Sequence, residues 1–201
     1  MERVDAMESI RISDMTMKLM AKRGDNPLSF KGKLEIAKLL DRLGVSVIEL
    51  EGLGDSKADA LRIRSISSAV KNSIVAVPVE LDARSVDAVW ETLKDAAHPR
   101  LQVTAPLSTV QMEYLSRKKP EAMLAAIGEI VAACAEKCPD VEFIAEDATR
   151  GNADFLCAAV QTAVKAGAST VTICDATGTM VSEEFSVFSG KPLILSAFRP
   201  A

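Results

Sequence analysis

Short apolar runs alternate with longer amphipathic segments along the whole chain. The short runs are rich in β-branched residues and predict strands, whereas the longer segments repeat their apolar residues at helical spacing. We expect seven strands, which cover residues 10–14, 45–50, 74–81, 101–105, 141–146, 170–174 and 192–198. Six main helices are expected at residues 30–43, 55–70, 82–97, 120–137, 152–166 and from 182 onward. This strict alternation predicts a parallel sheet with right-handed crossovers.

Residues at the ends of these segments predict where the elements begin and end. Ser29 can cap the first helix and Gly44 can end it. Pro120 stands at the first position of a later helix, where proline is tolerated. Ser108 or Thr109 can cap a shorter helix before it. These local signals place the helix boundaries without any knowledge of the packing.

Two segments fit the pattern less simply. Pro78 inside the third strand lacks a backbone N–H and predicts a bulge or an early strand end. The polar segment after the first strand, which contains Gly24 and Pro27, is predicted to be a long loop.

Helical spacing marks the apolar faces of the first two main helices. The apolar face of the first helix carries Leu34, Ile36, Ala37, Leu39, Leu40 and Leu43. The apolar face of the second helix carries Ala58, Leu61, Ile66 and Val70.

Two neighbouring strands end in carboxylates. Glu142, Ile144 and Glu146 share one face of their strand, so Glu146 points the same way as Glu142 at the carboxyl end. Asp175 follows the next strand in the same manner. Because chemistry in parallel α/β proteins is concentrated at the carboxyl ends of the strands, we expect these acids at one functional rim.

Composition sets the class of protein and excludes several partners. With 201 residues, 48% hydrophobic and 26% charged, we expect a single domain over residues 1–201. A net charge of −4 without a basic cluster argues against nucleic acid. The chain start lacks a signal-peptide pattern and no run is long enough to cross a membrane, so we expect a cytoplasmic protein with no membrane partner. Its four cysteines form no CxxC pair, and its single histidine makes a zinc site improbable.

Several stretches together carry a family resemblance. VEFIAEDATR at 141–150, AGASTVTICDATG at 166–178 and the acidic helix start SEEF at 182–185 resemble the isopropylmalate and homocitrate synthase family, which is related to hydroxymethylglutaryl-CoA lyase. Residues 33–51, 107–115 and the opening ISDMTMK extend the resemblance over nearly the whole chain. The resemblance implies a (β/α)8 TIM barrel that carries a divalent metal and joins an acyl-CoA to a 2-oxo acid in amino-acid biosynthesis. Such a barrel takes roughly 250 residues, so we expect an incomplete, truncated one with about seven strands and the last unit missing.

The same resemblance predicts that most metal-site residues are replaced. At the family's first-strand motif, Lys18 stands where an arginine binds the oxo acid, and Leu19 stands where an aspartate ligates the metal. An alkyl side chain donates nothing to a hard cation. Phe198 and Pro200 fall at the His-x-His pair of metal ligands. We therefore expect no metal and no other cofactor.

Other family positions keep residues that can carry chemistry. The resemblance places Glu146 at the catalytic glutamate and makes it, with Lys18, the candidate catalytic pair. The candidate substrate-binding residues are Asp14, Gln102, Arg150, Asp175 and Thr177. The structural alternative is that Asp147 pairs locally with Arg150 and that Thr149 only caps the next helix.

Three functions compete. The first is a divergent Claisen-type acyltransferase, impaired when alone, whose substrates are a 2-oxo acid and an acyl-CoA. The second is a non-catalytic or truncated homologue that serves as a binding or partner subunit, or one half of a split synthase. The third, a lyase with Lys18 as a Schiff-base nucleophile, needs that amine desolvated. An unclosed sheet has exposed edges, so we also expect a homo-oligomer or a complementary chain.

Overall fold

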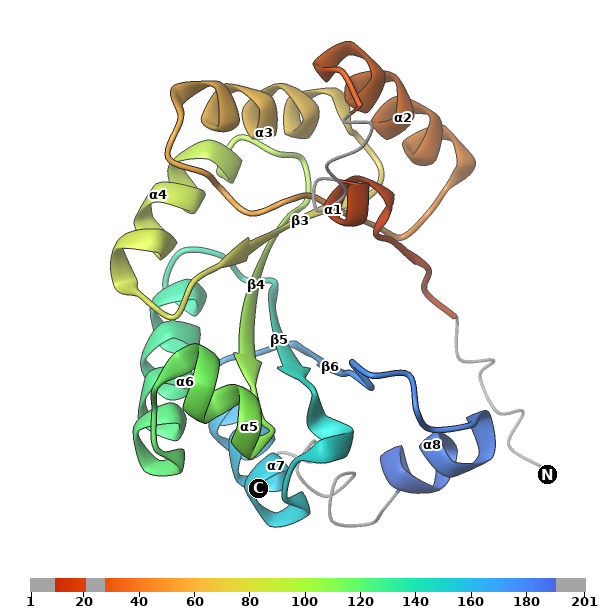
Figure 1. Ribbon diagram of the computed structural model, residues 1–201. Helices are drawn as coiled ribbons and strands as arrows, with labels where there is room; N and C mark the ends of the chain where they lie inside the picture. The colour runs from red at the N-terminus through yellow and green to blue at the C-terminus, as the bar shows by residue number, and fades with distance from the viewer. Residues whose placement is uncertain (1–9, 21–27, 191–201) are drawn as a thin grey trace, which may run out of the picture.

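The protein folds as a curled, all-parallel sheet with helices on its outer face (Figure 1). The computed structural model describes residues 10–20 and 28–190. Within these ranges six strands lie side by side in chain order: β1 (Ser13–Asp14), β2 (Val47–Glu49), β3 (Ile74–Val79), β4 (Pro99–Pro106), β5 (Val141–Glu146) and β6 (Thr170–Ile173). The sheet curves as part of a barrel wall, which confirms the predicted incomplete TIM-barrel-like fold.

Helices connect successive strands and cover the convex side of the sheet (Figure 1). The long ones are α2 (Phe30–Leu43), α3 (Lys57–Ala69), α4 (Ala83–Leu93), α6 (Pro120–Ala135) and α7 (Ala153–Lys165). The shorter helical elements are α1 (Thr16–Met20), α5 (Thr109–Gln111), the π-helical turn η1 (Met112–Ser116), the 3-10 turn η2 (Ala148–Arg150) and α8 (Ser182–Ser189). The core lies between sheet and helices, where Phe143, Leu101 and Ile127 are fully buried.

The predicted helix boundaries hold at their caps. The Ser29 side chain accepts from Gly32 N at 3.1 Å, and Gly44 ends α2 with a left-handed φ of 81°. Of the two candidates before the shorter helix, Ser108 is the N-cap. Pro120 opens α6, as expected.

Pro78 produces no bulge, and β3 ends at Val79, two residues before the predicted end. β3 runs to Val79 in regular register with β4, with Pro78 opposite Gln102. Ala76 O accepts from Leu50 N, so the main-chain groups of Ala76, and by alternation those of Pro78, face β2. Pairing with β2 has ended by that point. The backbone N–H that Pro78 lacks would not have formed a hydrogen bond to a neighbouring strand, so the sheet is not interrupted.

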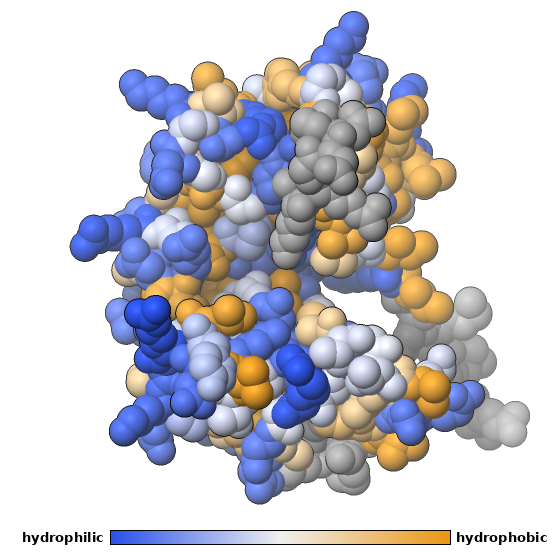
Figure 2. All heavy atoms as spheres, in the orientation of Figure 1, coloured by the Kyte–Doolittle hydropathy of each residue, from blue (hydrophilic) through white to orange (hydrophobic). Residues whose placement is uncertain are grey.

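Three other expectations were wrong in detail. The first strand is confined to Ser13–Asp14, and the predicted loop begins with α1, while residues 21–27 lie outside the described part. Leu39 and Leu43 of α2 are 55% and 78% exposed, because the buried face of α2 is formed by Lys33, Ala37 and Asp41. Leu61 of α3 is also exposed. Figure 2 shows hydrophobic surface over the region of α2.

The two outer strands of the described sheet are β1 and β6. The predicted seventh strand at 192–198 lies outside the described residues, so its pairing stays a prediction. In the part of the chain that the structure describes, no helix has the length and apolar character needed to span a membrane.

Candidate functional site

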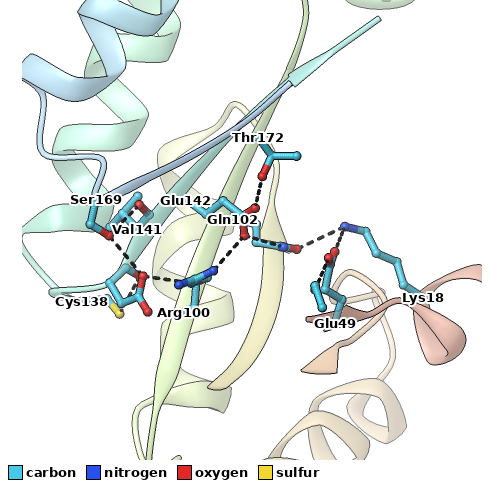
Figure 3. A network of polar contacts seen from close by, with 11 residues as sticks. Lys18, Glu49, Arg100, Gln102, Cys138, Val141, Glu142, Ser169 and Thr172 are labelled. Carbon is cyan, nitrogen blue, oxygen red and sulfur yellow. Dashed lines mark hydrogen bonds and ion pairs between the residues drawn. The ribbon is translucent and has the colours of Figure 1, made fainter. Parts of the chain in front are cut away.

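A line of polar side chains crosses the inner face of the sheet (Figure 3). Gln102 on β4 donates its amide N–H to Glu142 on β5 at 2.9 Å, and Thr172 on β6 donates to the same carboxylate at 2.5 Å. The strand register puts Gln102 opposite Glu142 and Glu142 opposite Thr172. These side chains therefore face the barrel interior, while Leu101, Val103 and Phe143 at the alternate positions are buried in the core.

Lys18 closes this line from the side of β1. Asp14 ends β1 and accepts from Thr16 N at 3.0 Å, which starts α1 immediately after the strand. The short helix brings Lys18 Nζ to Glu49 Oε2 at 2.7 Å and to Gln102 Oε1 at 3.2 Å. The adjacent Leu19 is 51% exposed. Lys18 and Gln102 are therefore in direct contact, whereas Asp14 bonds locally to Thr16 at the start of α1.

Hydrogen bonding keeps Glu49 ionised in its buried position. Burial alone would raise its pKa, but hydrogen bonds from Lys18 and from the Ser13 hydroxyl, 2.8 Å away, outweigh burial and lower the pKa below its usual range. The Lys18 charge is therefore compensated within the chain. Only part of its attraction remains for an incoming anion.

Arg100 anchors the other end of the line, at the amino ends of the strands. Its guanidinium donates through Nε to Asp140 at 2.9 Å and lies 3.5 Å from Glu142 Oε2 through Nη1. Ser169 donates to Asp140 at 3.2 Å. Figure 3 shows that these contacts belong to one network, which joins Arg100 on β4 to Glu142 on β5 and to Ser169 before β6. This end of the network is fully paired and holds the sheet together.

The rim at the carboxyl ends of β5 and β6 contains a second polar cluster. Asp147 is fully buried, and it accepts from Arg150 Nε at 2.8 Å and from the Ser108 hydroxyl. The hydrogen bond from Arg150 is the main cause that lowers the pKa of Asp147. The predicted local pairing of Asp147 with Arg150 is confirmed. The predicted cap was wrong: Asn152 caps α7, and Thr149 donates to Asp175 at 2.7 Å.

Asp175 organises the loop that follows β6. It accepts from Met180 N at 3.0 Å and from Thr149, and Thr177 Oγ1 lies 3.4 Å from it. These bonds, led by the one from Met180 N, lower the pKa of Asp175. Asp175 and Thr177 therefore lie together, and the pair stabilises the loop that leads to α8.

Glu146 differs from the other acids of the rim. It ends β5 and is half-buried, and among the described residues its side chain makes no hydrogen bond or ion pair. Cys174 follows β6 at the next position on the interior face. Burial raises the pKa of the Cys174 thiol, and the Glu146 charge raises it further. Cys174 N donates to Ala145 O at 3.0 Å, next to Glu146 on β5, and within the described part of the chain both carboxylate oxygens of Glu146 stay available.

The described residues do not fit the divalent metal that the resemblance implies. No group of three or more His, Cys, Asp or Glu side chains converges in residues 10–20 and 28–190. At the family's aspartate position Leu19 offers only carbon, and the nearby carboxylates of Asp14 and Glu49 already accept hydrogen bonds within the chain. Phe198 and Pro200 lie outside the described part.

Comparison with known proteins agrees with this scaffold. A family model described as HMGL-like matches residues 9–188. The chain belongs to this HMGL-like family. It is 35% identical over 187 residues to a 2-isopropylmalate synthase of Carboxydothermus hydrogenoformans, which covers 93% of this chain and 37% of the relative. A 2-isopropylmalate synthase of Shouchella clausii is 34% identical and covers 90% and 35%.

A solved structure has the same fold. The HMG-CoA lyase of Bacillus subtilis superposes with a TM-score of 0.71 at 13% identity, over 94% of this chain and 64% of that one. This HMGL-like chain spans about a third of the length of the curated relatives it matches, with 37% and 35% covered.

Sequence reasoning found part of the polar line and missed the rest. Gln102 and Lys18 were expected to serve the site, and they do meet there. Glu49, Arg100 and Cys174 were not expected as part of it. A usable signal existed for Glu49, because a charged residue inside a buried strand requires a partner, whereas Arg100 lay just before the predicted strand at 101–105.

Proposed function

We propose that this chain binds the substrates of the Claisen-type acyltransferases, a 2-oxo acid and an acyl-CoA, and is catalytically impaired when alone. The observation that carries the proposal is the position of Lys18, whose ammonium lies at the inner face of the sheet against Glu49 and Gln102. A cation at that place can attract the carboxylate of an oxo acid. Homology to 2-isopropylmalate synthases supports the same substrate classes.

Condensation requires a base and a group that polarises the oxo carbonyl. Glu146 supplies a carboxylate with no side-chain partner among the described residues, at the end of the strand next to Pro106 of β4. Lys18 is a point charge without the planar fork that grips a carboxylate through two hydrogen bonds, and Glu49 neutralises much of it. Family members use a divalent metal for polarisation, and the described residues offer no such cluster. Binding without efficient turnover is the proposed consequence.

Two measurements test the proposal. Calorimetric titration with pyruvate and branched 2-oxo acids is expected to show weak binding. We expect Lys18→Gln to lower the affinity about tenfold and Lys18→Arg to preserve it. A thiol-release assay with acetyl-CoA and the same acids is expected to show no release that depends on both substrates. Exposed Lys31→Gln is the matched control for the loss of one positive charge.

Each outcome has a defined meaning. Thiol release that depends on both substrates and disappears in Glu146→Gln would contradict the impairment. Failure of the wild-type chain to bind either substrate would favour the second candidate, a non-catalytic partner subunit or one half of a split synthase. The specific observation for that candidate is that β1 and β6 each have a single neighbour within the described sheet, and that Ile12 beside β1 is 62% exposed.

A further inference from the structure

A pocket of about 440 Å³ lies where the helical turn after β4 meets the start of α6. Its lining contains three consecutive cations, Arg117, Lys118 and Lys119, and one acid, Glu113. Met112 and Pro120 form its apolar part, and Thr109 completes the lining. The volume is within the range of about 300–1,000 Å³ that is typical of small-molecule sites. None of these residues belongs to the polar line described above.

The cations of this pocket have no partner among the described residues. Within residues 10–20 and 28–190, neither Arg117 nor Lys118 nor Lys119 forms an ion pair or a side-chain hydrogen bond. With Glu113 as the single acid in the lining, the pocket carries two net positive charges. Clustered like charges repel unless an anion neutralises them. The pocket therefore favours an anion that carries more than one negative charge.

The backbone holds these side chains in one place. η1 ends at Arg117, which adopts a left-handed φ of 51°, and Lys118 N donates to Met112 O at 3.2 Å. α6 then begins at Pro120, and no side chain caps its first turn. Free N–H groups at a helix start add to the attraction for negative charge. The tight turn thus presents three cations on a few residues.

The apolar part of the site indicates that the anion has a flat or hydrophobic body. Met112 forms the buried floor, with 4% of its surface exposed. Tyr114 and Val110, on the same turn, are 74% and 56% exposed. Tyr114 does not line the pocket but follows Glu113 of the lining in sequence, and an exposed aromatic side chain is suited to stacking on a heterocyclic base. Inorganic phosphate alone would leave this surface unused.

The pocket adjoins the rim on which Glu146 lies. Pro106, the last residue of β4, is opposite Glu146 in the sheet, and Leu107 N donates to Glu146 O at 2.9 Å. Ser108 then donates to Asp147 and caps the turn that leads into the pocket. Only the residues 107–108 separate the end of β4 from the first helical residue of the turn. A ligand can therefore extend from the pocket towards Glu146.

We infer that this pocket binds the phosphorylated adenosine end of the acyl-CoA. Its phosphates lie among Arg117, Lys118 and Lys119, the nucleoside lies against the apolar part, and the acyl thioester points to the rim. The inference rests on the proposed function, in that an acyl-CoA is the substrate. It adds the place and the residues that hold the nucleotide.

Calorimetric titration with adenosine 3′,5′-bisphosphate tests the inference without any reaction. This probe is the nucleotide end of CoA without its thioester, so it reports on the pocket alone. Lys118→Gln combined with Lys119→Gln is expected to weaken its binding at least tenfold. Lys57→Gln combined with Lys71→Gln, two exposed lysines elsewhere, is the control with the same loss of charge and is expected to leave binding unchanged. Neither pair belongs to the polar line.

The outcomes separate this inference from the proposed function. Binding of the bisphosphate that the pocket variant weakens supports the inference even if the thiol-release and oxo-acid measurements fail. Suppose that full-length CoA binds, and that the wild-type chain and the pocket variant have the same affinity for the bisphosphate. The inference about the pocket is then wrong, but an acyl-CoA remains supported as a substrate. Pyrophosphate that binds as tightly as the bisphosphate would contradict the assignment of a nucleoside.

Discussion

Two positively charged regions of this protein behave in opposite ways. On the inner face of the sheet, Lys18 and Arg100 each contact carboxylates from neighbouring strands. On the turn after β4, Lys118 and Lys119 contact none within the described residues. The difference teaches how much of each charge remains available to a ligand, because Lys18 keeps only part of its attraction for an anion. A charge compensated inside the protein rigidifies the sheet, whereas an uncompensated one at a pocket retains its attraction for an anion.

The strongest test of this comparison is to break the paired region at Arg100. Arg100→Met preserves most of the side-chain volume but leaves Glu142 and Asp140 without their cation. We expect the free energy of unfolding to fall by about 3 kcal/mol, because removing one partner of a buried pair strands the other charge. Urea unfolding measures this value.

Arg84→Met is the control for the Arg100 experiment, since Arg84 is exposed on α4 and has no ion pair among the described residues. It should change the stability by less than about 0.5 kcal/mol. A loss below about 1 kcal/mol in Arg100→Met would mean that the network contributes little to the fold.

Asp41 gives a test of intermediate size, because its buried charge is held by backbone groups. Burial would raise its pKa, but N–H groups of Ser73, Lys71 and Asn72, between 2.8 and 3.1 Å away, lower the pKa from 3.8 to about 2. The stabilisation of about 2 kcal/mol is present above pH 3.8 and is lost as the pH falls through about 2.

The matching variant is Asp41→Asn, measured by urea unfolding between pH 7 and pH 2. It should be less stable than the wild type by about 2 kcal/mol at pH 7, and the difference should disappear near pH 2. Asp55→Asn, at an exposed position, should show no such trend. A difference that does not depend on pH would refute the role of the charge.

The smallest effect is expected in the unpaired region. Lys118→Gln combined with Lys119→Gln should change the stability by no more than about 0.5 kcal/mol, because no internal partner is lost. Lys119 is the N-cap residue of α6 but its side chain makes no capping bond. Thermal unfolding of the variant beside the wild type measures the change. A marked loss of stability would show that these cations serve the fold and would remove the contrast between the two regions.

Local signals in the sequence were sufficient at three helix ends, but the helix predicted over residues 82–97 ends at Leu93. Ser29, Gly44 and Pro120 act through contacts a few residues away, so the sequence alone predicts them. α1 was missed because a helix of five residues is too short to show a period. The exposure of Leu39 could not be predicted, since helical spacing does not say which side of an apolar helix meets the sheet.

The site was harder to predict than the fold. The chemical types of Glu146 and Lys18 follow from the sequence, but the contact between Lys18 and Glu49 joins residues 31 positions apart. That contact depends on the register of β1 on β2 and on the start of α1. The pocket after β4 could not be predicted from the sequence, because three cations in a row usually indicate only a solvated turn. The volume of the pocket, and the fact that its cations pair with no described residue, follow only from the three-dimensional structure.

The order of the strands also affects how the chain reaches its fold. All strands that pair in the described sheet are consecutive in sequence. Each new strand–helix unit can therefore dock on a template that already exists when the chain is synthesised from its amino end. Within the described sheet each strand pairs with a strand close to it in sequence, so the entropy lost on closing each intervening segment stays small. Co-translational folding of this sheet can proceed one unit at a time.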